Sequence, residues 1–401
     1  MTVRDLLTLN DVDLAGKKVL VRVDFNVPLK DGRVHDDTRI RASLRSLHQI
    51  LQAGGRLILM SHLGRPREGS FDPSLSLQPV ADHLATLMKR RVILVSDWKD
   101  IDFDDSDIYL LENVRFLEGE KANDDALAQR MASLCDVYVN DAFATAHRAQ
   151  ASTHGVARYA PVACAGPLLV NEIEHLSRAF EKPAHPMVAI VGGSKVSTKL
   201  TVLETLLPRV DQLIVGGGIA NTFLKAAGHD VGLSLYEADL VDKASELAER
   251  VRQGGGEIPM PVDVVCGKHF SEDAEAVTKA VDAVEEDDLI MDIGPETAAV
   301  YSRILADAAT IIWNGPLGVF EFSQFGGGTR ALAEAIAGSQ AFSVAGGGDT
   351  LAAIAEFGVA DRLSYISTGG GAFLEFLEGK SLPAITILEE TAQAWRQAGN
   401  G

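Results

Sequence analysis

The sequence predicts an α/β protein made of two lobes. Short runs rich in β-branched residues alternate with stretches of helical periodicity, and uniformly apolar strands are typical of parallel sheets covered on both faces. A chain of 401 residues has room for two or three domains. Residues 1–170 hold 15 arginines and 9 glycines, whereas residues 171–401 hold 8 arginines and 28 glycines. We therefore expect two Rossmann-like lobes, each a parallel sheet flanked by helices, joined by a helix and a hinge.

The expected strands are short apolar runs, and the expected helices carry apolar residues spaced four, three and four apart. The strands are Lys18–Val23, Arg56–Met60, Val92–Val95, Ile108–Leu111, Asp136–Val139, Val188–Val191, Gln212–Val215, Val262–Cys266, Leu289–Asp292, Thr310–Trp313, Ala341–Val344 and Leu363–Ile366. Two helical stripes are Ile40, Leu44, Leu47 and Leu51, and Val196, Leu200, Leu203 and Leu207.

A helix over Leu168–Phe180, with Glu172, Glu174 and Arg178 exposed, is expected to precede the domain junction. It runs into Lys182–Pro186, where two prolines stop a helix and make a stiff connector. This predicts an N-terminal lobe with the interdomain helix at 1–182 and a C-terminal lobe at 183–380, followed by a segment at 381–401.

Composition excludes several classes of protein. Hydrophobic residues make up 46% of the chain, which is too many for a disordered protein. Lys and Arg total 37 against 56 Asp and Glu, a net charge of −19 that disfavours nucleic acid and anionic membranes as partners. The three cysteines are far apart, and neither a signal peptide nor a spanning segment is evident. We expect a cytoplasmic protein that is monomeric by default.

Basic and amide residues follow the predicted strands of the first half. They are Asp24 and Asn26, then Arg39 at a helix start, His62 to Arg65 (with Leu63 and Gly64), Arg115, and Arg148. Because ligands bind at the carboxyl edge of an open α/β sheet, Arg39, His62, Arg65, Arg115 and Arg148 are expected to face one crevice. Arginine pairs bidentately with carboxylate and phosphate, so the set fits a small polyanion. The alternative for each basic residue taken alone is a solvated loop residue. The alternative for Asp24 and Asn26 is that they only form a turn.

Glycine clusters end the predicted strands of the second half. They are Gly192–Gly193, Gly216–Gly218, Gly346–Gly348 and Gly369–Gly371, and a fifth turn runs Asn314–Gly315–Pro316–Leu317–Gly318 toward Glu321. Glycine lets a ligand approach the backbone, and amides at a helix start attract phosphate, although glycines also serve tight turns. Neither a Walker A motif nor a dinucleotide fingerprint is present.

Two lysines and one aspartate sit beside these glycines. Lys195 and Lys199 are expected in the first turns of a helix. Cations there interact unfavourably with the helix dipole unless an anion such as a polyphosphate lies in front of them. The alternative is that both lysines are simply solvated. Asp349 reads as an N-cap or, next to a nucleotide, as a ligand of Mg²⁺.

These motifs resemble the phosphoglycerate kinase family. The matching segments are Asp24–Pro28, Ser61–Pro66, Leu111–Phe116, Asn140–Phe143, Gly192–Lys199, Trp313–Pro316, Gly346–Asp349 and Ser367–Gly371, in order along nearly the whole chain. The resemblance implies transfer of a phosphoryl group between 1,3-bisphosphoglycerate and ADP, giving 3-phosphoglycerate and ATP, and return of residues 381–401 to the first lobe. Ser194, Thr198 and Ala144 depart from the usual Ala, Asp and Gly without removing a charged group that the reaction needs.

The resemblance also implies roles for individual residues. The phosphoglycerate would be held by Asp24, Asn26, Arg39, His62, Leu63, Gly64, Arg65, Arg115 and Arg148. The nucleotide would be held by Gly192, Gly193, Lys195, Lys199, Gly217, Asn314, Pro316, Gly318, Glu321, Gly347, Gly348, Asp349 and Thr350, with Glu321 on the ribose and Asp349 on Mg²⁺. The catalytic set would be Arg39, Lys199, Lys195, Gly347 and Gly370.

Substrates held on different lobes require closure about the connector. Two other hypotheses stay open from the sequence: a kinase that phosphorylates a different carboxylic acid, and a two-lobed protein that binds an anion without chemistry.

Overall fold

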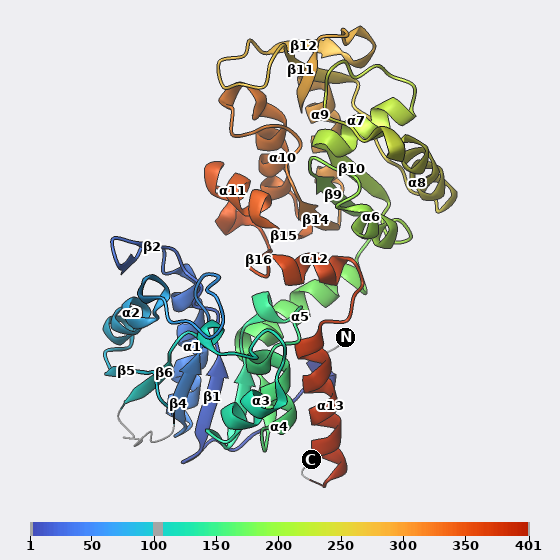
Figure 1. Cartoon of the computed structure of the whole chain (residues 1–401). Coiled ribbons are helices and arrows are strands. Elements are labelled where there is room, and N and C mark those ends of the chain that lie inside the picture. Colours follow the sequence, from blue (N-terminus) through green and yellow to red (C-terminus); the bar gives the residue numbers. More distant parts are fainter. Residues whose placement is uncertain (1–2, 99–106, 400–401) are drawn as a thin grey trace. The chain divides into compact units, whose positions relative to one another are not determined.

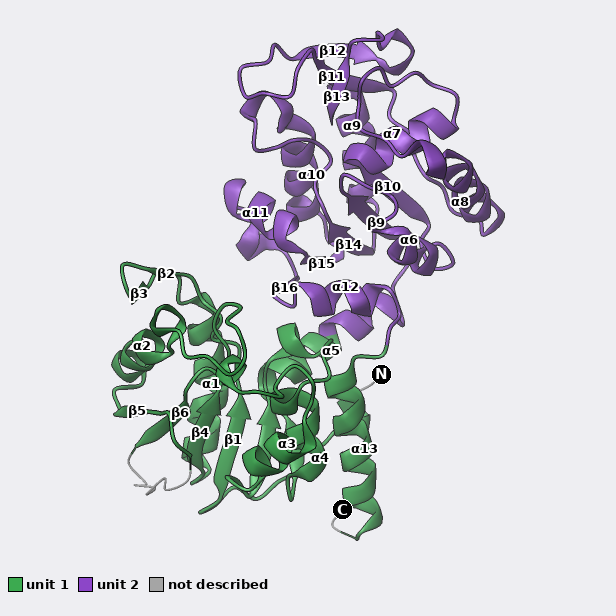
Figure 2. Ribbon diagram, viewed as in Figure 1, with its two compact units in different colours: residues 1–174, 381–401 green, residues 175–380 purple. Residues whose placement is uncertain are grey.

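The computed structural model describes residues 3–98 and 107–399 and divides into two compact units (Figures 1 and 2). Unit 1 is Met1–Glu174 with Ser381–Gly401, and unit 2 is His175–Lys380. The division lies inside α5 (Pro167–Phe180), earlier in the chain than the Lys182–Pro186 segment where the sequence places the junction. In the described part of the chain no helix is long and apolar enough to cross a membrane.

Unit 1 is built on a six-stranded sheet in the order β5-β6-β4-β1-β7-β8. Its strands are β1 (Lys18–Arg22), β4 (Arg56–Met60), β5 (Val92–Val95), β6 (Ile108–Leu111), β7 (Val137–Asn140) and β8 (Ala163–Ala165), all parallel to their neighbours. The register pairs Arg22 with Met60 on one side and with Asn140 on the other. The loops that follow these three strands therefore begin at the same level on one edge of the sheet.

Helices α1 (Thr38–Gln52), α2 (Gln78–Met88), α3 (Asp125–Ala132) and α4 (Val156–Tyr159) also belong to unit 1, as does α13 (Pro383–Gln397). The apolar strand residues and the helix stripes form one core, in which Ile40 and Leu47 of α1 are fully buried. Helix α13 is tied to this unit by a hydrogen bond from the Ala384 amide to the Ala146 carbonyl at 3.1 Å. Arg396 donates to the Leu6 carbonyl at 2.8 Å.

Unit 2 contains a five-stranded parallel sheet in the order β10-β9-β14-β15-β16 (Figure 1). The strands are β9 (Met187–Gly192), β10 (Gln212–Gly216), β14 (Thr310–Asn314), β15 (Phe342–Gly346) and β16 (Tyr365–Ser367). The helices are α6 (Leu200–Leu206), α7 (Gly217–Ala226), α8 (Val241–Gln253), α9 (Pro295–Ala306), α10 (Gly327–Gly338), α11 (Gly348–Glu356) and α12 (Gly371–Leu377). Four of these strands end in the glycine clusters that the sequence singles out or in Asn314 before Gly315.

Unit 2 also contains a small second sheet that the sequence analysis does not anticipate. Strands β11 (Asp263–Gly267), β12 (Val277–Ala280) and β13 (Leu289–Ile293) form a separate antiparallel sheet in the order β12-β11-β13. The segments that join them contain no α-helix, and parallel neighbours need a crossover that is usually helical. Strand β12 is largely exposed and has no apolar run, which is why the sequence pattern does not reveal it.

Two local expectations are also corrected. Helix α6 begins at Leu200 with Lys199 at its N-cap, so Lys195 and Lys199 lie in or at the end of the preceding turn and not in the first turns of the helix. Buried Val196 anchors that turn, which accounts for an apolar spacing that continues beyond the helix. In α5, Glu172 is buried, whereas Glu174 and Arg178 are exposed as expected.

Removal of a buried side chain from α13 should destabilise unit 1. Leu388 is fully buried, so Leu388→Ala is expected to lower the free energy of unfolding by about 2–5 kcal/mol through lost burial and a residual cavity. Urea denaturation followed by circular dichroism, with hydrogen exchange of β8 as the local reporter, measures the change. Gln393→Ala on the exposed face of the same helix is the control. An unchanged exchange rate in β8 would show that α13 does not support this unit.

Candidate active site

The carboxyl edge of the unit 1 sheet gathers positive charge. We call Arg22, Arg39, Arg65, Arg115, Arg148 and His62 the cationic cluster. Burial lowers the pKa of His62 well below its usual value, and the charges of Arg22, Arg115, Arg148 and Arg39 lower it further. Burial also lowers the pKa of Arg115 to about 10, with Arg148, Arg22 and Arg65 acting in the same direction. These side chains therefore lie close enough to interact electrostatically, as expected for groups at a single sheet edge.

Asp24 and Asn26 hold the loop after β1 against its neighbours. Arg39 Nη1 donates to Asp24 Oδ2 at 2.7 Å and to the Asn26 carbonyl at 3.3 Å. The Asn26 side-chain oxygen accepts from the Gly64 amide at 2.9 Å, which links the loops after β1 and β4. Both residues thus make the contacts expected of residues that form a turn. Asp24 also orients the Arg39 guanidinium.

Arg115 is held beneath the loop after β4. Its guanidinium donates to the Gly64 carbonyl, and its side chain is buried although its pKa keeps it charged at neutral pH. Asn113 supports the same loop by donating to the Leu63 carbonyl at 2.8 Å. Arg148 is half-buried with its Nε donating to His147 Nε2 at 3.0 Å, whereas Arg65 is exposed.

Sequence reasoning missed Arg22, the most buried member of the cationic cluster. It is the last residue of β1 and is only 1% exposed. A charged residue directly after three apolar strand residues and before Val23 was the available signal, because full burial of Arg requires partners. Its Nη2 lies 3.2 Å from His62 Nδ1.

In unit 2, several glycines are required because the turns pack backbone against backbone. A Cβ on Gly192 would collide with the Pro316 carbonyl, and one on Gly218 would collide with the Ser194 carbonyl. The Gly217 amide donates to the Leu317 carbonyl at 3.0 Å, which joins the turn after β10 to the turn after β14. These glycines shape the site by letting three turns meet.

Other glycines face open space. A Cβ on Gly348 or Gly370 would meet no atom within 4 Å. Gly347, the N-cap of α11, has φ +103°, a conformation that other residues rarely adopt. The start of α11 therefore presents amides that a ligand can reach, and such amides attract anions.

Lys199 belongs to a polar network at the ends of three strands. Its Nζ donates to the Asn314 side-chain oxygen, and Asn314 Nδ2 donates to the Gly346 carbonyl at 2.7 Å. Burial lowers the pKa of Lys199, while Asp349 and Glu378 oppose that shift. Thr350 Oγ1 accepts from the Gly315 amide at 2.8 Å, so the turns after β14 and β15 are tied together.

Lys195 and Asp349 are both exposed. Asp349 is the second residue of α11, so the N-cap reading is wrong, since Gly347 occupies that position. Its carboxylate is exposed at the helix start, within electrostatic reach of Lys199.

A pocket of about 750 Å³ lies beside these turns. Among its lining residues are Gly193, Gly217, Pro316, Gly318, Glu321 and Asp349, all expected to contact a nucleotide. Leu233, Leu235 and Phe270 also line it and are 65%, 53% and 66% exposed, unusually open for large apolar side chains. Sequence reasoning missed these apolar residues, because their segments follow neither strand nor helix periodicity. A pocket lined by both glycine turns and apolar side chains suits a ligand with a phosphate tail and a flat base.

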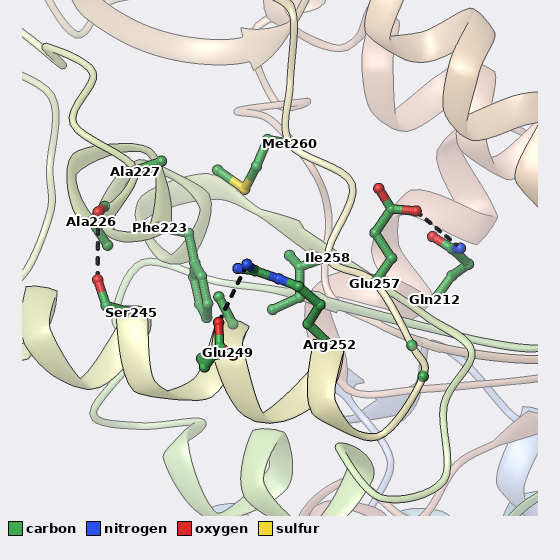
Figure 3. Close-up of a pocket in the computed structure, with 13 residues that line it drawn as sticks. Gln212, Phe223, Ala226, Ala227, Ser245, Glu249, Arg252, Glu257, Ile258 and Met260 are labelled. Atoms are coloured by element: carbon green, nitrogen blue, oxygen red, sulfur yellow. Dashed lines mark hydrogen bonds and ion pairs between the residues drawn. The ribbon is translucent and has the colours of Figure 1, made fainter.

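A second pocket, of about 810 Å³, does not share this chemistry. Gln212, the first residue of β10, lines it, so it lies toward the amino end of that strand (Figure 3). Arg252 is paired with Glu249 at 3.3 Å, and Gln212 with Glu257 at 3.5 Å. The glycine turns of the strand ends are not among its lining residues.

Across residues 3–98 and 107–399, one acidic cluster has the spacing of a metal site: Glu285, Asp287 and Asp288. Lys268 contacts all three carboxylates at 2.6 to 2.9 Å, and Lys279 contacts Asp288 at 2.7 Å. The two ammonium groups offset two of the three negative charges of this cluster.

One unit with a cluster of guanidinium groups and another with reachable helix-start amides define a phosphoryl-transfer enzyme of the two-unit α/β class. The profile of the phosphoglycerate kinase family matches residues 9–380. The chain belongs to the phosphoglycerate kinase family. The fold class, the family resemblance and the enzyme class predicted from the sequence are thereby confirmed.

The similar proteins cover nearly the whole chain. A phosphoglycerate kinase of Nitratidesulfovibrio vulgaris (strain Miyazaki F) is 60% identical over 386 residues, which is 96% of this chain and 98% of that protein. The structure of phosphoglycerate kinase from Coxiella burnetii superposes with a TM-score of 0.93 at 53% identity, covering 96% of this chain and all of that one. The enzyme from Pyrococcus horikoshii gives 0.80 at 33% identity, covering 97% of this chain and all of that one.

The open space at Gly348 gives a test of the α11 start. Gly348→Ala is expected to raise the Kd for Mg-ADP by about tenfold or more, because its methyl group occupies space that a phosphate would use. The melting temperature should not fall, since the added Cβ meets no atom of the protein. Calorimetric titration and thermal unfolding measure the two effects.

Gly338→Ala is the matched control, because it also adds a Cβ in open space but at the far end of α10. Equal affinity for Mg-ADP in the two variants would show that the phosphates do not bind at the start of α11.

Proposed function

We propose that the chain catalyses reversible transfer of the 1-phosphoryl group of 1,3-bisphosphoglycerate to ADP, giving 3-phosphoglycerate and ATP. The observation that carries this proposal is the convergence of four arginines around His62 in unit 1, with Arg65 near Arg115. So much positive charge at one sheet edge is unfavourable without an anion of several charges, and a phosphorylated carboxylic acid supplies one.

The phosphoglycerate is held by unit 1. Arg39, Arg65, Arg115 and Arg148 pair with its phosphate and carboxylate, and His62 adds a neutral donor. Asp24 and Asn26 accept from its hydroxyl while keeping Arg39 and the loop of Leu63 and Gly64 in place. These are the residues that the family resemblance implies, and their contacts in unit 1 support the assignment.

The nucleotide is held by unit 2. Its phosphates bind the amides of Gly193, Gly347 and Gly348 together with Lys195, Lys199 and Thr350, while Glu321 receives the ribose. Gly192, Gly217, Asn314, Pro316 and Gly318 shape the walls, and Leu233, Leu235 and Phe270 cover the base. Mg²⁺ enters with the nucleotide as part of the substrate; the single, exposed carboxylate of Asp349 at the start of α11 suits an ion that keeps its phosphate and water ligands.

The chemistry requires alignment and charge neutralisation rather than a general base. The acceptor for the ATP phosphoryl group is a carboxylate, which is already ionised at neutral pH. Arg39, Lys199, Lys195 and the amides near Gly347 and Gly370 would stabilise the charge on the transferred group. Because the two substrates bind different units, the reaction requires the units to approach each other about a hinge. The three buried, unpaired cysteines are in keeping with a cytoplasmic enzyme, which we propose acts as a monomer.

Arg39→Ala is expected to lower kcat at least ~10²-fold while the Kd for Mg-ATP stays within about twofold, the pattern of a lost transition-state contact. A coupled assay for ADP release and a binding titration measure the two quantities. Arg41→Ala serves as control, since Arg41 lies on the same helix, is exposed and pairs with Asp37. A wild-type kcat in Arg39→Ala would remove Arg39 from the chemistry.

Closure predicts a change of shape that needs both ligands. In X-ray scattering, the radius of gyration should fall when 3-phosphoglycerate and Mg-ADP are present together, and much less with either alone. The full decrease with one ligand would contradict the requirement for both units.

A further inference from the structure

Beneath the cationic cluster, three fully buried polar side chains from distant segments form a chain of hydrogen bonds. Arg22 is the last residue of β1. Glu120 lies in the loop after β6, the loop that also carries Arg115, and Ser152 lies in the helical turn Ala151–Gly155. Their exposed fractions are 1%, 0% and 0%. None of the three has a role in the substrate contacts proposed above.

Ser152 connects the two charged groups. Its hydroxyl donates to Glu120 Oε1 at 2.5 Å and accepts from Arg22 Nε at 3.1 Å, while its amide donates to Glu120 Oε2 at 2.9 Å. Burial raises the pKa of Glu120 and lowers that of Arg22, and the attraction between the two charges opposes both shifts. Glu120 is therefore the buried countercharge of Arg22 in surroundings that are otherwise cationic.

The other end of Arg22 faces His62. Arg22 Nη2 lies 3.2 Å from His62 Nδ1, and Nη1 donates to the Val23 carbonyl at 2.5 Å. A guanidinium has five donors and no acceptor, so His62 Nδ1 must be the acceptor and carries no proton. The buried ring is surrounded by arginine charges that disfavour the imidazolium, so its single proton is on Nε2.

We propose that Arg22, Ser152 and Glu120 form a positioning relay that fixes His62 as a neutral imidazole protonated on Nε2. This inference deepens the proposed function, since it assumes that the cationic cluster binds the phosphoglycerate. His62 then offers an oxyanion one hydrogen-bond donor without adding charge to a site that already holds five arginines. Glu120 acts through Arg22 and touches no substrate.

The first experiment observes the tautomer directly in the free protein. The full chain is labelled with ¹⁵N-histidine, and the His62 ring signals are assigned by their loss in His62→Gln. At neutral pH we expect one neutral form with Nε2 protonated and Nδ1 not. An imidazolium, or a proton on Nδ1, overturns the relay whatever the enzyme's substrate is.

The second experiment removes the countercharge. Glu120→Gln is expected to raise KM for 3-phosphoglycerate about tenfold, change kcat and KM for Mg-ATP less than about threefold, and shift the His62 ring signals. Glu118→Gln, an exposed carboxylate on the same loop, should match the wild type in every measurement. Wild-type KM and ring signals in Glu120→Gln overturn the role of Glu120.

Ser152→Ala gives a second variant that leaves both charges in place. It is expected to raise the same KM by a smaller factor, about threefold, with a shift of the His62 signals in the same direction. Unchanged His62 signals would show that the bridge does not act on His62. If the wild type proves inactive on 3-phosphoglycerate but its ring carries the Nε2 proton, the proposed function fails while the relay stands.

Discussion

The structure of unit 1 depends on how it tolerates repulsion between like charges. The charges of Arg22, Arg115 and Arg148 lower the pKa of His62, those of Arg148 and Arg22 lower the pKa of Arg115, and burial lowers both pKa values further. Two carboxylates offset this repulsion: the partly buried Asp24 and the fully buried Glu120. The remaining excess of positive charge is what makes an anionic ligand favourable at this edge of the sheet.

Unit 2 can also attract an anionic ligand, but the glycine turns that do so carry almost no net charge. Gly192 and Gly218 allow the turns to pack against one another, and Gly348 leaves its helix start open. Backbone amides then supply the donors, and Lys199 supplies one cation that a network through Asn314 orients. A nucleotide suits this arrangement because an apolar surface for the base lies beside the amides.

Most of the fold could be predicted from the sequence, because Val92–Val95 is apolar throughout, Arg56–Met60 is apolar after its first residue, and both ranges match the structure. The antiparallel sheet was missed because the apolar runs of β11 and β13 resemble those of the parallel strands, and only the lack of an α-helix between them distinguishes them. The short hairpin of β2 (Leu29–Lys30) and β3 (Arg33–Val34) has too few residues to show a period.

Part of the candidate site could be predicted from the positions of its residues relative to the strands. Arg39, His62 and Arg115 follow strands, so topology alone groups them. Arg22 lies inside a strand and Glu120 and Ser152 lie in loops, so their meeting depends on tertiary packing that no local pattern records. Likewise, Leu233 and Phe270 come together only where irregular segments meet beside the glycine turns.

Hydrogen exchange with each substrate added separately tests most directly whether the two units bind different ligands. With 3-phosphoglycerate alone, exchange should slow in the loops 24–26, 61–65 and 113–115 of unit 1. With Mg-ADP alone, it should slow at 216–219 and 347–350 of unit 2. Protection of the same segments by both ligands, or protection of the opposite unit by either, would contradict the account.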